Sequence, residues 1–409
     1  MKKNMLIAQS GGPTAVINSS LAGAIRRAKA SGEIGTIYGG LHGIEGILQE
    51  KIIDAGKYFE SEADFQKLMH TPSSALGTCR FKLSKVVDEN YEKLSQILLK
   101  YNIGYFMYIG GNDSMDTVDK LGAFFAEKGM DVKCIGIPKT IDNDLVIIDH
   151  TPGYASAARY VATSLAEIYC DTLVYDRPMV TVVEIMGRNA GWLTAAAVMA
   201  RADGSPAPQL IYLPEFPFDP DAFENDIREV AKNHKAIVVA VSEGVKFKSG
   251  EYVTASKAGE LDSFGHASLS GAGQYLGDFI KHKFGYKTRV IELSLLQRAA
   301  AHIASDTDVE EAAICGAHAV DYALAGMNRV MVVMKRVSND PYTIEYEPVD
   351  VSKIANAEKK LPAEWILNNG RDMSDEFIAY LKPMIQDKDG RVVPAHFRFD
   401  KTDLAKLPK

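Results

Sequence analysis

The chain has 409 residues, of which 46% are hydrophobic, 24% charged and 9% aromatic, values that exclude collagen, coiled-coil and disordered classes. At roughly 150 residues per domain, its length corresponds to about two to three domains. The 46 Lys and Arg against 53 Asp and Glu give a net charge of −7, so we expect no nucleic acid and no membrane among the main partners. The N-terminal apolar run is too short for a secretory signal, and the four cysteines show no CxxC spacing, so we expect a cytoplasmic protein.

Short apolar runs that end in glycine or polar residues recur along the chain. Helical patterns follow several of them, at 16–29, at 118–128 and in the alanine-rich stretch 190–201. Continuous apolar strands that alternate with helices are typical of a parallel sheet covered on both faces. The pattern therefore predicts a doubly wound α/β fold, with strands at 5–8, 105–109, 132–137, 179–185, 236–241 and 289–293.

Few features mark domain boundaries. Residues 151–154 are a candidate crossover between domains, and a second domain boundary is expected near Asp340 and Pro341. The charged stretch 353–360 is expected to form a helix. The chain contains no internal repeat of fixed period.

Polar and glycine residues gather where the predicted strands end, in SGG, GGNDS, PKTIDND, MGR and SEG. In doubly wound sheets, ligands bind just beyond the carboxyl ends of the strands. Any one of these segments could equally be a simple turn. Five together favour a binding site built from strand ends.

Gly11 and Gly12 follow the first predicted strand and precede a predicted helix. Glycine there lets backbone amides approach an anion, and a helix N-terminus favours negative charge. The chain has no GxxxxGK[ST] motif, and the glycines at 271, 273 and 277 have the wrong spacing for dinucleotide binding. A P-loop kinase and a nicotinamide enzyme are therefore disfavoured.

The segment 138–144, PKTIDND, is the most informative. In extended backbone Asp142 and Asp144 face the same side, with Lys139 and Thr140 beside them. A carboxylate next to a hydroxyl-binding threonine suits general-base work on an alcohol. The alternative is a solvated acidic turn, which the preceding lysine and threonine disfavour.

Three arginines are candidates for binding phosphate, because arginine makes bidentate bonds with it: Arg188 at a strand end, Arg80 and Arg298. A lone arginine is more often part of a surface ion pair, and this applies most to Arg298. The nine histidines show no metal-ligand spacing, and no GxSxG elbow occurs. Together the residues favour phosphoryl transfer without a Walker motif.

From Gly11 to about Arg298, these motifs in this order resemble the phosphofructokinase family, and specifically its pyrophosphate-dependent branch. The resemblance implies two doubly wound, Rossmann-like lobes with the active site in the cleft between them. Residues 1–155 with 298–350 would form the phosphoryl-donor lobe. Residues 156–297 with 351–409 would form the sugar-phosphate lobe.

The resemblance also implies roles for individual residues. Asp142 would be the base that takes the proton from the C1 hydroxyl of fructose 6-phosphate, with Thr140 and Ile141 beside that end of the sugar. Arg289 would come from a neighbouring subunit. The catalytic candidates are Asp142, Lys139, Asp113 and Arg188. The remaining substrate-binding candidates are Gly11, Gly12 and Arg80 on the donor side, and Met186, Gly187, Arg188, Glu243, Gln297 and Arg298 on the sugar side.

Two positions are expected to select the donor. ATP-dependent relatives have glycine where Asp113 and Lys139 stand, which leaves room for a nucleotide. Asp113 would place bulk and negative charge at the α-phosphate position. Lys139 would instead reach a pyrophosphate oxygen.

Three departures from the family pattern matter. Asn112 stands where relatives often have an aspartate for Mg²⁺, so the metal is expected at Asn112 with Asp113 or Asp144 as alternatives. Leu295 replaces a residue that touches the sugar phosphate. Met179 replaces a phosphate-binding arginine.

The implied reaction is reversible, Mg²⁺-dependent phosphoryl transfer from pyrophosphate to fructose 6-phosphate in glycolysis and gluconeogenesis, by a homodimer or homotetramer. Two alternatives remain open on the sequence alone. One is an ATP-dependent phosphofructokinase. The other is a non-catalytic subunit that binds sugar phosphate.

Overall fold

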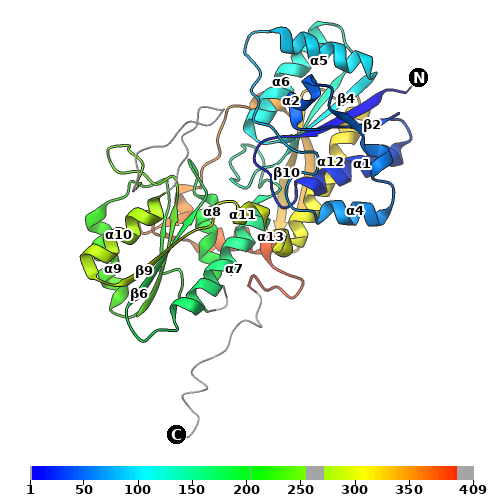
Figure 1. The fold of residues 1–409 in the computed structure, drawn as a ribbon. Helices are drawn as coiled ribbons and strands as arrows, with labels where there is room; N and C mark the ends of the chain where they lie inside the picture. Colours follow the sequence, from blue (N-terminus) through cyan, green and yellow to red (C-terminus); the bar gives the residue numbers. More distant parts are fainter. Residues whose placement is uncertain (1, 203, 255–270, 394–409) are drawn as a thin grey trace.

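The computed structural model describes residues 2–202, 204–254 and 271–393, which form two lobes side by side (Figure 1). The strands are β1 (Asn4–Gln9), β2 (Ile37–Gly40), β3 (Ile52–Asp54), β4 (Ile103–Gly110), β5 (Lys133–Pro138), β6 (Met179–Ile185), β7 (Leu210–Tyr212), β8 (Ala236–Ser242), β9 (Lys287–Glu292), β10 (Val330–Asn339), β11 (Tyr342–Asp350), β12 (Ile366–Leu367) and β13 (Asp372–Met373). The α-helices are α1 (Ile17–Ser31), α2 (Gly43–Leu48), α3 (Ala55–Tyr58), α4 (Glu62–Met69), α5 (Glu89–Lys100), α6 (Asn112–Glu127), α7 (Tyr154–Thr172), α8 (Trp192–Ala195), α9 (Pro220–Ala231), α10 (Ala272–Phe284), α11 (Leu296–Ala299), α12 (Asp306–Leu324) and α13 (Asp375–Ile385). Short 3₁₀ helices are η1 (Ala196–Arg201), η2 (Ala301–Ile303), η3 (Val351–Lys353) and η4 (Ala363–Trp365).

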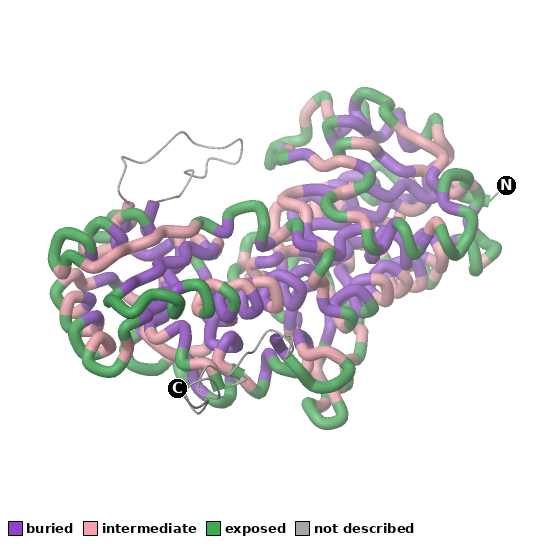
Figure 2. Tube along the Cα trace, turned by 60° about the horizontal axis from the view of Figure 1, so that its bottom comes forward, coloured by how far each residue is buried: buried purple, intermediate pink, exposed green. Residues whose placement is uncertain are grey.

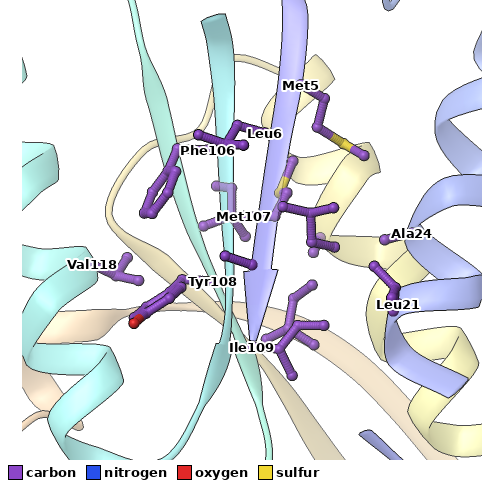
Figure 3. Close-up of a cluster of buried hydrophobic side chains, with 14 of the residues drawn as sticks. Met5, Leu6, Leu21, Ala24, Phe106, Met107, Tyr108, Ile109 and Val118 are labelled. Atoms are coloured by element: carbon purple, nitrogen blue, oxygen red, sulfur yellow. The ribbon is translucent and has the colours of Figure 1, made fainter. Parts of the chain in front are cut away.

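The first lobe is built on a sheet with the strand order β11-β10-β5-β4-β1-β2-β3. Its strands are parallel except at the two edges, where β3 and β11 run antiparallel to their neighbours. The central strands β1 and β4 are buried over nearly their whole length and mostly apolar, as expected where helices cover both faces. Figure 3 shows their side chains packed in a buried hydrophobic cluster with Leu21 of α1 and Val118 of α6. The predicted doubly wound α/β fold is confirmed.

Helices α1 and α12 cross with their backbones almost in contact. A Cβ atom on Gly23 would lie 1.9 Å from the carbonyl oxygen of Ala313, and one on Gly316 would lie 2.0 Å from that of Ser20. Such approach is possible only without side chains at both positions. The crossing fixes α12, which comes late in the chain, onto the first helix.

The second lobe is built on an all-parallel sheet with the order β7-β8-β6-β9. One face packs against α7, η1 and α13, and the other against α9 and α10, where Phe218 and Phe223 lie in an aromatic cluster. Figure 2 shows buried chain in the centre of each lobe and exposed chain at the periphery. No helix in the described part of the chain is both long and apolar enough to cross a membrane.

The chain passes between the lobes more than once. After the second sheet it returns to complete the first with β10 and β11, and it then runs back to α13 (Figure 1). The lobe boundaries expected above stay a prediction, and residues 255–270 and 394–409 within them lie outside the described residues.

Two local expectations were wrong, and a third was met in part. Asp340 and Pro341 form the tight turn between β10 and β11, not a domain break. The alanine-rich stretch is helical from Trp192 to Arg201, but only its first turn is an α-helix and the rest is η1. The stretch 353–360 is not helical beyond Lys353, because the backbone of 356–359 bonds to other segments instead.

Candidate active site

A cavity of about 510 Å³ opens at the carboxyl ends of β1, β4 and β5 on one side and of β6 and β8 on the other. It therefore lies between the two sheets, at the strand ends where the sequence predicts a site. Most of the predicted residues line it: Gly11, Gly12, Arg80, Asn112, Asp113, Lys139, Thr140, Ile141, Asp142, Asp144, Met186, Arg188, Glu243 and Arg298.

Lys139 lies at the end of β5 and reaches across to the glycine turn that follows β1. Its Nζ donates a hydrogen bond to the carbonyl oxygen of Gly12 at 2.7 Å. Burial lowers the pKa of Lys139 to about 8. The result is a cation held in the cavity wall.

The turn at Gly11 and Gly12 does not have the structure that the sequence predicts, which is glycine amides at a helix N-terminus that bind an anion. Gly11 has a φ of +74°, which favours glycine, but its amide donates to the carbonyl oxygen of Cys79 at 3.1 Å. Helix α1 begins only at Ile17, so its N-terminus is not at Gly12. Gly12 instead leaves room for an arginine, because a Cβ there would lie 2.7 Å from Nη1 of Arg298.

The helix N-terminus that faces the cavity belongs to α6. This helix begins at Asn112, six residues earlier than predicted, so Asn112 and Asp113 lie in its first turn. Gly111 and Ser114 also line the cavity. The positive end of the helix dipole and the first amides favour an anion there.

Thr140, Asp142 and Asp144 form the loop after β5. The amide of Asp142 donates to Oγ1 of Thr140 at 3.1 Å, and this hydroxyl is 3.4 Å from Oδ2 of Asp142. Burial raises the pKa of both carboxyls, and for Asp144 the nearby charge of Asp142 adds to the effect, while Lys139 opposes it at Asp142. A carboxylate with raised proton affinity beside a hydroxyl is suited to receive a proton.

Asn143 lies between these carboxylates and was missed by the sequence reasoning. Its φ is +53°, so the backbone turns here and is not extended as expected. Its fully buried side chain accepts a hydrogen bond from the amide of Thr151 at 3.1 Å and donates one to the hydroxyl of Tyr380 at 3.2 Å. These bonds hold the loop so that Asp142 and Asp144 both reach the cavity.

The opposite wall is formed by the loops after β6 and β8. The amide of Gly187 donates to Oε1 of Glu243 at 3.3 Å, and burial raises the pKa of Glu243 to about 7. Nε of Arg188 is buried and has no hydrogen-bond partner among the described residues. This wall therefore offers one carboxyl group and one guanidinium to a polar ligand.

Two predicted residues lie behind this wall. Gly187 is buried, and Gln297 accepts a hydrogen bond from the amide of Met186 at 3.3 Å. Both support the loop and do not line the cavity. Arg289 lies on β9, outside the cavity, and pairs with Asp171.

Asn112 and Asp113 both have protein partners. The Asn112 amide bonds to the backbone of Asn356 and Ala357, and Asp113 lies 3.2 Å from Nζ of Lys82. No cluster of three or more His, Cys, Asp or Glu side chains suited to a metal ion occurs among the described residues.

Several further residues that line the cavity were not predicted. They come from the segment after Arg80, from the residue after Arg188, and from a late segment of the chain: Phe81, Asn189, Asn356, Ala357 and Glu358. Proximity to a predicted motif could have suggested the first two. No local pattern marks residues 356–358.

The chain resembles known proteins over most of its length. A family model described as phosphofructokinase matches residues 4–323. A protein of Methylococcus capsulatus named pyrophosphate–fructose 6-phosphate 1-phosphotransferase is 41% identical over 95% of this chain and 92% of its own length. One of the same name from Xanthomonas campestris pv. campestris is 42% identical over 94% and 91%. The crystal structure of a pyrophosphate-dependent phosphofructokinase from Marinobacter aquaeolei matches with a TM-score of 0.83 and 38% identity, covering 94% of this chain and 91% of that one.

Proposed function

Because this chain belongs to the phosphofructokinase family, which matches residues 4–323, we propose that it transfers a phosphoryl group from pyrophosphate to the C1 hydroxyl of fructose 6-phosphate. The products are fructose 1,6-bisphosphate and phosphate, and the reaction is reversible. The family and enzyme class expected from the motifs are confirmed, since relatives 41% and 42% identical carry that enzyme's name. The observation that carries the proposal is that Asp113, Lys139 and Asp142 line one cavity.

Asp142 is the base. It takes the proton from the C1 hydroxyl as that oxygen attacks the phosphoryl group, while Thr140 orients the carboxylate through its hydroxyl. Ile141 packs beside the same end of the sugar. Proton removal by a positioned carboxylate contributes on the order of 10²–10⁴ in rate.

The donor is bound by positive charge on one side of the cavity. Lys139 contacts a pyrophosphate oxygen, and Arg80 and the first turn of α6 face the rest of the donor. Fixed charges of this kind stabilise the transferring phosphoryl oxygens without reorganisation. Asp113 stands where the next phosphate of a nucleotide would lie and excludes it.

The sugar is held from the opposite wall. Met186 and Gly187 shape the loop, Glu243 accepts hydrogen bonds from sugar hydroxyls, and Arg188 reaches the reacting phosphoryl group. Arg298 binds the 6-phosphate, and Gln297 supports it by holding Met186.

Mg²⁺ fits the donor chemistry of this cavity. Mg²⁺ is usually held by one or two carboxylates together with substrate phosphates. Asp144 and Asp113 supply such carboxylates on the cavity lining, whereas the Asn112 amide is engaged by backbone. When bound, the ion would neutralise charge on the pyrophosphate oxygens. Asn112 as a ligand, a homodimer or homotetramer, and a cytoplasmic location stay predictions.

The test is a coupled assay of the purified protein with fructose 6-phosphate and Mg²⁺, comparing pyrophosphate with ATP. We expect turnover with pyrophosphate and little with ATP. Turnover with ATP alone would establish the ATP-dependent alternative instead. Binding of sugar phosphate without turnover by either donor would establish a non-catalytic subunit.

A further inference from the structure

Residues 356–359, here called the strap, cross the donor side of the cavity. At one end, Nδ2 of Asn112 donates to the carbonyl oxygen of Ala357 at 2.6 Å, and the amide of Asn356 donates to Oδ1 of Asn112 at 2.5 Å. Asn356 Nδ2 also donates to Oδ1 of Asp116 at 3.2 Å. Both halves of the Asn112 amide are thus used to hold the strap against the first turn of α6.

The other end of the strap is fixed to the loop after β5. The amide of Lys359 donates to the carbonyl oxygen of Asp144 at 2.7 Å. Its Nζ donates to Oδ1 of Asn143 at 3.2 Å and to the carbonyl oxygens of Ile148 and Asp149 at 3.1 and 2.8 Å. Three acceptors around one ammonium group make this end a firm attachment.

Between these ends, Asn356, Ala357 and Glu358 line the cavity beside Asn112 and Asp113. In Figure 1 the orange chain that follows β11 starts at the lobe of α6 and runs toward the other lobe. Glu358 adds a negative charge near Asp144. A donor that extends past the pyrophosphate position would meet this wall of backbone and negative charge.

Building on the proposed function, we propose that Asn112 is a specificity-determining residue: it clamps the strap so that the donor side admits pyrophosphate and excludes longer phosphate chains. An amide side chain meets both ends of this contact, since one end must donate and the other accept, whereas an ionised carboxylate can only accept. Aspartate at 112 would turn a second oxygen toward the carbonyl of Ala357 and lose the 2.6 Å bond.

The test is calorimetric binding of inorganic pyrophosphate and inorganic tripolyphosphate, each with Mg²⁺ and without sugar, to the full chain. The variants are Asn112→Ala and Asn112→Asp, with exposed Lys353→Ala, which precedes the strap, as the control. We expect the wild type to prefer pyrophosphate. We expect both Asn112 variants to reduce this preference at least about threefold, the scale of one lost hydrogen bond, by binding tripolyphosphate more tightly.

Tighter binding of the longer anion is a result that general damage to the site would not produce. An unchanged preference in both Asn112 variants would overturn the proposal. A second result would also overturn it: Asn112→Asp binds Mg²⁺-pyrophosphate more tightly than the wild type and still prefers pyrophosphate to tripolyphosphate. That result would assign Asn112 to the metal. If the Asn112 variants do not fold, Asn356→Gly removes the Asp116 bond while keeping a residue suited to the φ of +63° at this position, and the same shift is expected. Because no sugar is present, absence of fructose 6-phosphate turnover would overturn the proposed function without deciding this one.

Discussion

The ammonium group of Lys139 donates a hydrogen bond of 2.7 Å to the carbonyl oxygen of Gly12. The bond joins the loop after β5 to the turn after β1, two segments 127 positions apart in the chain. Lys139 is only 3% exposed, and its burial brings its pKa down to about 8. The cation proposed to bind pyrophosphate therefore titrates close to neutral pH.

The first prediction concerns this titration. Between pH 7 and pH 9 the charged fraction of Lys139 in the free protein falls from about nine-tenths to about one-tenth, given a pKa of about 8. We expect kcat/KM for pyrophosphate to decline over the same range, because the neutral amine attracts the anion less. Lys139→Arg keeps its charge and should shift or abolish this decline. An identical decline in that variant would assign the titration to another group.

The second prediction concerns the base. Asp142→Ser should lower kcat by about 10²–10⁴, the range for a lost general base, while fructose 6-phosphate still binds. Steady-state kinetics and calorimetry with the sugar phosphate measure the two effects. Asp131→Asn, which changes an exposed carboxylate just before β5, is the control. An unchanged kcat in Asp142→Ser would remove Asp142 from its role.

The third prediction concerns a buried histidine outside the cavity. Nδ1 of His150 lies 2.7 Å from Asp149, and Nε2 lies 2.7 Å from Glu311. Burial disfavours the charged ring, but the two carboxylates outweigh burial and raise the pKa of His150 to about 9. Arg336 also pairs with Asp149 at 2.8 Å, so the cluster links β10 and α12 to the segment before α7.

A raised pKa means that folding favours the protonated ring. The stabilisation is complete below pH 6.5 and is lost as the pH rises through 9, an effect of ~3 kcal/mol in the free energy of unfolding. Urea unfolding at a series of pH values should show this loss in the wild type. His150→Gln should lack it, and His70→Gln, at an exposed position, should retain it. Equal pH dependence in all three would contradict the assignment.

The fourth prediction concerns the helix crossing of the first lobe. Gly23→Ala places a Cβ 1.9 Å from the carbonyl oxygen of Ala313, so α1 and α12 must move apart. We expect a loss of ~1–3 kcal/mol in the free energy of unfolding, as for other overpacked positions. Gly56→Ala is a useful comparison, since the nearest atom to the added Cβ there is Cβ of Ile37, at 3.3 Å. Equal stability of the two variants would show that the crossing adapts.

The fifth prediction concerns Arg289. Arg289 lies on β9 and pairs with Asp171 of α7, away from this subunit's cavity. If Arg289 serves a neighbouring subunit, Arg289→Ala should raise KM for fructose 6-phosphate several-fold, whereas Asp171→Ala should not. Equal KM values in both variants and the wild type would remove Arg289 from the site.

Sequence reasoning found the site because strand ends of a parallel sheet meet at one edge, so five separate segments could be placed together. The Lys139–Asp142 loop, Arg188 and Glu243 all line the cavity as expected. Sequence reasoning missed the features of the site that depend on contacts between residues far apart in the chain. The bonding partners of Asn112 lie about 245 positions later, in a segment whose charge and spacing predict a helix, and no motif indicates them.

The same limit explains why a helix is expected at 353–360 and why Asn143 was missed. Charge and spacing favour a helix at 353–360, but the hydrogen bonds offered by Asn112 and by the carbonyl of Asp144 hold the backbone of 356–359 out of a helix. Tertiary contacts of this kind outweigh local helix propensity. Asn143 was passed over because an asparagine between two aspartates looks like an ordinary turn residue.

The return of the chain to its first sheet has a consequence for synthesis. The outer edge of β5 pairs with β10, which begins at Val330, after all of β6–β9 has been made. During translation, β5 therefore remains an edge of the first sheet while about 190 further residues leave the ribosome, counting from Pro138. Exposed strand edges invite pairing with other chains. In the finished sheet the edge passes to β11, whose residues are exposed or half-buried, so the mostly apolar β5 is open to such pairing only in this interval.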